Sequence, residues 1–159
     1  MLDLLRYFIG DVKQVSCFEK TRLVKMRGND IAVATLDFEC GALGTLVSTW
    51  ASKGAPWHDS ILIQGSRGAC HTINGLHLKE GNSPFTCVYA DNDSTDAKGE
   101  WRFRTSYREE IRHFLECLRD EKEPMTSGND NLKTMAAIEA MFLSSKEGRA
   151  VQVRELLEE

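Results

Sequence analysis

The chain has 159 residues, of which 42% are hydrophobic and 28% charged, and it carries a formal net charge of −4. This length suits one domain with its own core, and the weak acidic charge excludes the basic surface needed to bind nucleic acid or an anionic membrane. No apolar run approaches the roughly 18 residues of a membrane span, so we expect neither a span nor a signal peptide, and a cytoplasmic location.

The first ten residues, MLDLLRYFIG, have the pattern of a short helix. Gly10 stands where a left-handed C-cap would end it, and Asp3 is the only plausible start signal although it lies inside the apolar run. Such a short helix is marginal by itself. We therefore expect residues 1–10 to be the end of a longer helix whose beginning precedes Met1. The apolar residues at helical spacing are Leu2, Leu5, Phe8 and Ile9.

Four short segments rich in β-branched residues follow and predict consecutive strands. In the second of them, both alternating faces are largely apolar, so we expect helices on one side of the sheet and a partner subunit on the other. Gly41-Ala42-Leu43-Gly44 joins two of these strands and predicts a hairpin turn. The segments are VKQVSCFEKTRLV, IAVATLDFE, GTLVSTWAS and DSILIQG.

The stretch ACHTINGLHLKE predicts a two-residue type I′ hairpin, because Asn74-Gly75 lies between two apolar alternations. This register pairs His71 with Leu78 and places His71 and His77 on opposite faces, which excludes them as a metal pair. Two more strands are expected in FTCVYA and EWRFR.

The last third of the chain is helical by its pattern. Ser106-Tyr107-Arg108-Glu109 predicts a capping box at the start of one helix, and LKTMAAIEAMFLSSKEG predicts a second that ends at the C-cap Gly148. AVQV predicts a closing strand. The whole is predicted to be a single α+β domain over residues 1–159, with a largely antiparallel open sheet covered on one face by helices.

The residues alone give few candidates for chemistry. Five widely spaced cysteines predict reduced thiols, His113 is expected to pair with Glu109 on a helix surface, and no catalytic or metal-ligating set is visible. There is no Walker loop, no nucleophile elbow and no G-x-G-x-x-G, so no dinucleotide site is predicted.

One loop, TWASKGAPWHDS, combines aromatic and polar side chains as a sugar or polyol site would. The alternative is a turn stapled by tryptophan that packs on the helices. The candidates for substrate binding are Trp50, Lys53, Trp57 and His58.

Taken in order, four segments resemble the C-terminal domain of the Gfo/Idh/MocA oxidoreductases, whose fold is of the GAPDH-like C-terminal type. The first ten residues are similar to the end of an H-x-x-D-x-x-R-[YW]-x-x-G helix, and ILIQGSRGACHTI resembles an I-x-G-(T/S)-x-G strand and turn. The other two segments are NDIAVATLDFECGALGTLVSTW, which is similar to the family's long hairpin, and residues 107–153, which resemble its closing pattern of helix, Pro, G-x-D, second helix and G-R-x-V.

This resemblance implies an NAD(P)-dependent dehydrogenase acting on a secondary alcohol of a sugar, cyclitol or sugar nucleotide. Asp3 matches the Asp of the active-site helix, so the substrate-contacting His would stand immediately before Met1. The Rossmann domain and the Lys of an E-K-P motif would also lie outside this chain. We therefore expect no catalytic residue and no NAD or NADP site here, and no turnover by this chain alone.

Two further expectations follow from the resemblance. Trp57 falls at a position where an aromatic residue reaches the substrate, with His58 beside it, and the sheet would serve as the interface of a homodimer or tetramer. The alternative is a free-standing, non-catalytic α+β module that binds a ligand or only assembles.

Overall fold

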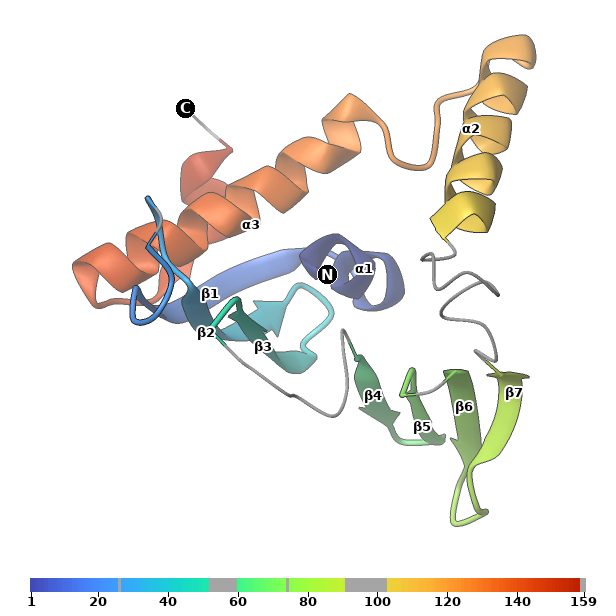
Figure 1. The fold of residues 1–159 in the computed structure, drawn as a ribbon, viewed down its shortest axis with the longest axis horizontal. Helices are drawn as coiled ribbons and strands as arrows, with labels where there is room; N and C mark the ends of the chain where they lie inside the picture. The colour runs from blue at the N-terminus through green and yellow to red at the C-terminus, as the bar shows by residue number, and fades with distance from the viewer. Residues whose placement is uncertain (26, 52–59, 74, 91–102, 158–159) are drawn as a thin grey trace. The chain divides into compact units, whose positions relative to one another are not determined.

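The computed structural model describes residues 1–25, 27–51, 60–73, 75–90 and 103–157. The chain divides into two compact units (Figure 1): a first unit of Met1–Gly54 with Met125–Glu159, and a second unit of Ala55–Pro124. Compact units are not by themselves separate domains, so the single-domain organisation stays a prediction.

The first unit is a four-stranded antiparallel sheet with helices packed on one face. The order of its strands is β3-β2-β1-β8, so the last strand of the chain lies beside the first. Its elements are α1 (Leu2–Ile9), β1 (Val12–Lys20), β2 (Ile31–Phe38), β3 (Leu43–Thr49), α3 (Gly128–Glu147), β8 (Val151–Gln152) and the 3₁₀ turn η1 (Val153–Leu156).

The alternation of β2 confirms the predicted faces. Leu36 and Phe38 are 1% exposed and point to the core, whereas Val33 on the opposite face is 44% exposed. β2 and β3 are joined by the predicted hairpin turn, where Gly41 has a φ of 84°, a conformation that favours glycine. The sheet therefore has one covered and one open apolar face.

Helix α3 lies across β1 (Figure 1) and closes the core. Ala137 and Ala140 are fully buried, and their small side chains let the helix backbone approach the strand closely. The Ser144 hydroxyl links the layers, because it accepts a hydrogen bond from the Cys17 amide at 2.9 Å and donates one to the Arg149 carbonyl at 2.6 Å.

The ends of the two helices agree with prediction to different degrees. Ser127 caps α3 by accepting from the Asp130 amide, and Gly148 adopts the predicted left-handed C-cap with φ 67°. Gly10 ends α1 as expected, but its φ of 115° and ψ of −174° lie outside the αL region, so the predicted left-handed cap is wrong, although the positive φ still favours glycine. The chain must turn directly into β1 there, which an extended ψ allows.

The second unit contains an antiparallel sheet in the order β4-β5-β6-β7 and one helix. The predicted α+β class with antiparallel sheets is thereby confirmed, although its strands form two sheets. The elements are β4 (Leu62–Gly65), β5 (Gly68–His71), β6 (Gly75–Glu80), β7 (Thr86–Ala90) and α2 (Phe103–Arg119).

The register of the β5–β6 hairpin differs by one residue from the prediction. His71 faces His77, and their rings stack with centroids 4.6 Å apart, so the two imidazoles share one face. The cause lies next to the turn: Thr72 exchanges hydrogen bonds with Ile61, which extends the loop beyond two residues. Asn74 itself lies outside the described residues.

Helix α2 begins at Phe103, before the predicted N-cap Ser106, so the predicted capping box is wrong. Phe103 and Arg104 are helical, so the end of the strand expected in EWRFR is wrong. The first three residues of that segment lie outside the described residues. Serine is tolerated within a helix at small cost, so the cap signal does not fix the boundary.

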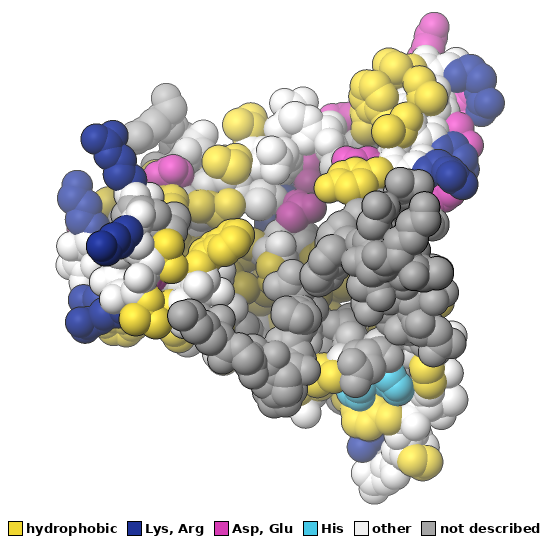
Figure 2. Space-filling model, viewed as in Figure 1, with side chains coloured by type: hydrophobic (Ala, Val, Ile, Leu, Met, Phe, Trp, Pro, Cys, Tyr) yellow, Lys and Arg dark blue, Asp and Glu magenta, His cyan; other side chains and the backbone are white. Residues whose placement is uncertain are grey.

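Hydrophobic side chains gather along α2 (Figure 2), as its periodicity predicts. The apolar stripe of α2 consists of Tyr107, Ile111, Phe114, Leu115 and Leu118, which are 49–61% exposed.

No helix in the described parts of the chain is both long and apolar enough to cross a membrane. The cytoplasmic location stays a prediction.

Candidate functional site

A cavity of about 280 Å³ opens at the end of the first sheet where β3 ends. Trp50, the residue after β3, is 78% exposed at its edge and is fixed by its amide, which donates to the Asp30 carbonyl at 2.8 Å. The apolar lining includes Leu2 of α1 and Phe142 of α3. An aromatic ring at the rim of a mostly apolar cavity is typical of small-molecule sites.

Glu19 and Asn29 provide polar groups in this cavity. The Asn29 amide nitrogen donates to Glu19 Oε2 at 2.9 Å, and the Glu19 backbone amide donates to Ser145 Oγ at 2.9 Å. Burial raises the pKa of Glu19, and the hydrogen bond from Asn29 opposes that shift without cancelling it. The cavity therefore holds a partly desolvated carboxylate.

Asp30 builds the wall beside Trp50. It is 1% exposed, and its carboxylate accepts hydrogen bonds from the amides of Arg22, Leu23 and Val24 at 2.7–3.1 Å. The hydrogen bonds from Val24 and Leu23 are the largest influence on its pKa and hold it below the ordinary value. The Asp30 carboxylate thus holds residues 22–24 in place, and its backbone carbonyl positions Trp50.

Replacing Asp30 with Asn should destabilise the first unit at pH 7, because the amide cannot accept all these hydrogen bonds. A lowered folded-state pKa stabilises the fold above the unfolded value of about 3.9 and ceases to do so as pH falls through the folded-state value. Urea unfolding measured from pH 7 towards pH 2 should therefore show the free energies of unfolding of the variant and the wild type converging. Asp37→Asn, which removes a partner of exposed Lys13, is the control. An equal difference at every pH would contradict this assignment.

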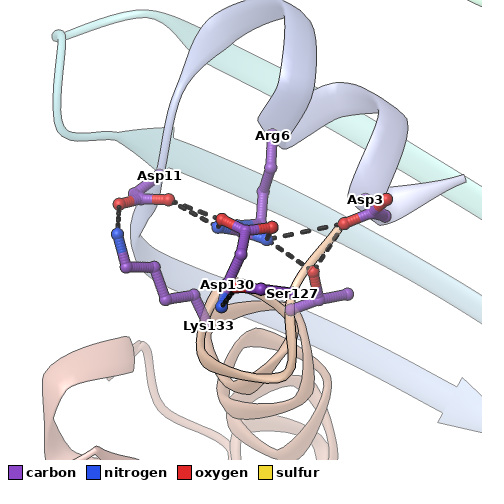
Figure 3. A network of polar contacts seen from close by, with 7 residues as sticks. Asp3, Arg6, Asp11, Ser127, Asp130 and Lys133 are labelled. Carbon is purple, nitrogen blue, oxygen red and sulfur yellow. Dashed lines mark hydrogen bonds and ion pairs between the residues drawn. The ribbon is translucent and has the colours of Figure 1, made fainter. Parts of the chain in front are cut away.

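A second polar centre anchors α1 on α3 (Figure 3). The Arg6 side chain is 5% exposed, and it reaches three carboxylates that are 40–49% exposed. Its guanidinium donates to Asp11 at 2.8 Å, to Asp130 at 2.9 Å and, less closely, to Asp3 at 3.5 Å. A buried guanidinium requires such partners, because an unpaired one is very costly to desolvate.

Thr134 and Lys133 of α3 complete this network. Thr134 Oγ1 accepts from Arg6 at 2.6 Å and donates to Asp3 at 2.9 Å, while Lys133 donates to Asp11 at 2.7 Å. Burial alone would raise the pKa of Asp11, but the hydrogen bonds and positive charges of Lys133 and Arg6 outweigh it and lower the pKa. The network therefore fixes α1, including Asp3, on the N-terminal turns of α3.

The predicted site residues are only partly placed. Trp50 lines the cavity, whereas Lys53, Trp57 and His58 lie outside the described residues. Asp3 does not cap α1, since no side chain caps that helix, and instead bonds Arg6 and Thr134. Sequence reasoning missed Glu19 and Asn29, which local pattern does not distinguish from surface polar residues.

The histidines among the described residues belong to no group of metal ligands. His71 and His77 share a face, contrary to prediction, but among the described residues no three His, Cys, Asp or Glu side chains are grouped to hold an ion. Glu109 pairs with Arg112, and the ring nitrogens of His113 lie 3.6 and 3.9 Å from the Cys117 sulfur. The described geometry thus directs attention to the Trp50 cavity.

Known proteins resemble this chain along nearly its whole length. A protein of Paraburkholderia graminis described as D-apiose dehydrogenase is 30% identical over 98% of this chain and 43% of its own length. Myo-inositol 2-dehydrogenase of Thermotoga maritima is 26% identical over 98% of this chain and 47% of its own length. The chain thus spans less than half the length of these curated relatives.

Solved structures of oxidoreductases are also similar to this chain. An oxidoreductase from Agrobacterium radiobacter, solved in complex with NAD⁺, L-tartaric acid and magnesium, is 29% identical, with a TM-score of 0.85 over 98% of this chain and 47% of its own. The WlbA dehydrogenase of Bordetella pertussis, 22% identical with a TM-score of 0.73 over 95% of this chain and 41% of its own, shares the fold. The family model for the Gfo/Idh/MocA "Oxidoreductase family, C-terminal alpha/beta domain" matches residues 1–153, and the chain belongs to this family.

Proposed function

We propose that this chain is the substrate-side and oligomerisation domain of an NAD(P)-dependent oxidoreductase acting on a secondary alcohol of a sugar, cyclitol or sugar nucleotide. The observation that carries the proposal is the match of residues 1–153 to the family's C-terminal domain, together with relatives named as dehydrogenases of D-apiose and myo-inositol. The Trp50 cavity supports it, because an aromatic ring with nearby carboxylate, amide and hydroxyl groups suits a polyhydroxylated ligand.

The described residues do not fit a dinucleotide. Gly41, Gly65 and Gly68 lie at turns that join strand to strand, and the sequence contains no G-x-G-x-x-G. We propose that cofactor binding, and the proton transfer that accompanies hydride transfer, are carried out by residues outside this chain. This chain contributes one wall of the substrate pocket, with Trp50, Lys53, Trp57 and His58 as its proposed contacts.

The first test compares this chain with the product of the complete reading frame that encodes it. We expect no oxidation of NADH above background by the chain alone, and NAD(P)-dependent oxidation of a sugar, cyclitol or sugar nucleotide by the complete protein. In the latter, Trp57→Ala should raise KM about tenfold, since loss of one stacking ring costs roughly 1.4 kcal/mol. Turnover by the isolated chain, or an inactive complete protein that still binds polyols, would overturn the proposal.

The open face of the first sheet supports the oligomerisation role. Phe18, Val33 and Val47 lie directly opposite one another on β1, β2 and β3 and are 73%, 44% and 66% exposed. A hydroxyl row of Ser16 and Thr35 runs beside them in the same register. An apolar row across three strands is unusual on a monomer and suits an isologous contact with a second copy.

Val33→Asp should therefore weaken the dimer at least about a hundredfold, because it places an unpaired carboxylate at the centre of the apolar row. Analytical ultracentrifugation of wild type and variant over a concentration series measures this. Leu132→Asp, a similar change at an exposed position of α3, is the matched control and should leave association unchanged. A dimer that survives Val33→Asp would place the contact elsewhere.

A further inference from the structure

We propose that Glu19 makes the Trp50 cavity selective for neutral polyhydroxylated ligands, by accepting hydrogen bonds from ligand hydroxyls and by repelling ligands that carry a carboxylate or phosphate. This inference rests on the proposed function and narrows its substrate class to uncharged sugars and cyclitols.

The strand places Glu19 where a carboxylate is not expected. Val15 and Cys17 precede it at alternate positions of β1, are 0% and 3% exposed, and face the core that α3 covers. Glu19 continues this row at the end of the strand, half-buried in the cavity lining. A carboxylate on the core face loses hydration, as the raised pKa of Glu19 reflects. It is stabilised only where hydrogen-bond donors reach it.

The protein supplies few such donors. Asn29 donates to Oε2 at 2.9 Å, and within the described residues Oε1 accepts no hydrogen bond. An ionised carboxylate can accept about four hydrogen bonds, so most of the capacity of Glu19 remains for a ligand. Ligand hydroxyls are suitable donors because charge-assisted hydrogen bonds to a carboxylate are short and strong.

The rest of the cavity fits the body of such a ligand. Trp50 offers a ring face at the rim, Phe142 and Met141 provide apolar surface, and Ser48 offers a hydroxyl. The volume of about 280 Å³ lies at the small end of ligand pockets, which span roughly 300–1,000 Å³. This volume accommodates a single sugar or cyclitol ring.

The charges around the cavity oppose an anion. Glu19 and Asp30 are both in its lining, and the described lining contains no lysine or arginine. The backbone amides of residues 22–24 already donate to the Asp30 carboxylate, so they are not available to bind an anionic ligand. Within this described lining, an anionic ligand would face the Glu19 carboxylate and no cation at short range, where screening by salt is weak.

The test uses D-glucose and D-glucuronate, which share a pyranose ring and differ in a carboxylate. Their binding to this chain is measured at pH 7 by saturation-transfer NMR and by tryptophan fluorescence. We expect D-glucose to bind at least about tenfold more tightly than D-glucuronate. Glu19→Gln, which keeps the shape and a partner for Asn29, should reduce that preference to less than about twofold.

Glu39→Gln is the matched control, because it removes the same charge from an exposed turn at the other end of β2. It should leave the preference unchanged, and thermal unfolding of both variants verifies that they fold. A preference that persists in Glu19→Gln, or equal binding of both probes to wild type, would overturn the role of Glu19 while leaving the substrate wall intact. Binding of neither probe to any variant would instead overturn the substrate wall and this inference together.

Discussion

Replacing Arg6 with Met should lower the stability of the first unit by about 3 kcal/mol. Methionine retains an unbranched chain similar to the aliphatic part of arginine but removes the cation that Asp11, Asp130 and Asp3 share. Losing one partner of a buried ion pair typically costs about 3–5 kcal/mol, and the partial exposure of these carboxylates places the expected loss at the lower end. Helix α1 should detach before the sheet unfolds, since Arg6 is its main polar anchor.

Native-state hydrogen exchange separates these events, because amides of α1 and β1 report on different openings. Protection of α1 should fall first, followed by a smaller loss in β1. Arg119→Met is the control, since Arg119 pairs with Asp120 at an exposed site, and its loss should leave the stability nearly unchanged. Unchanged protection of α1 in Arg6→Met would show that apolar packing alone holds the helix.

Replacing Gly68 with Ala should disrupt the β5–β6 hairpin of the second unit. A Cβ added at Gly68 would lie 2.0 Å from the carbonyl oxygen of Lys79 and 3.1 Å from Cα of Glu80, and these are backbone atoms that cannot rotate away. The two strands must separate, which we expect to cost about 3 kcal/mol or more. The effect should be local, since Gly68 faces Glu80 at the end of the pairing.

The Gly81 amide provides the measurement, because it donates to the Arg67 carbonyl at 2.8 Å beside this contact. Its exchange should accelerate at least about a hundredfold in Gly68→Ala. Gly65→Ala is the matched control: Gly65 faces Gly68 across the turn, and an added Cβ there meets nothing within 4 Å. Equal effects of the two substitutions would contradict the steric explanation.

Local pattern predicted most of the strands and helices because their signals act over a few residues. Alternation placed Leu36 and Phe38 in the core, and the αL glycine Gly148 marked the end of α3. The register of the β5–β6 hairpin could not be predicted, because it depends on the hydrogen bonds that Thr72 exchanges with Ile61, just before β4. Asn-Gly favours a two-residue turn only where such contacts do not compete.

The candidate site was less predictable because it, too, depends on contacts between residues that are far apart in the sequence. Trp50 stood out by residue type, but Arg6 bonds Asp130 across 124 positions, and Glu19 meets Asn29 only because β1 and β2 pair. The sequence contains the D-x-x-R and G-x-D patterns that supply Asp3, Arg6 and Asp130, yet only the fold brings them together.

The division of the first unit between Met1–Gly54 and Met125–Glu159 has a consequence for synthesis on the ribosome. Strands β1, β2 and β3 emerge early, but α3 and β8, which cover and complete them, follow only after the whole second unit has been translated. At about 5–20 residues per second, those roughly 70 intervening residues take several seconds. During that interval Val15, Leu36 and Phe38 lack their cover, so the nascent sheet exposes an apolar face from which aggregation can begin.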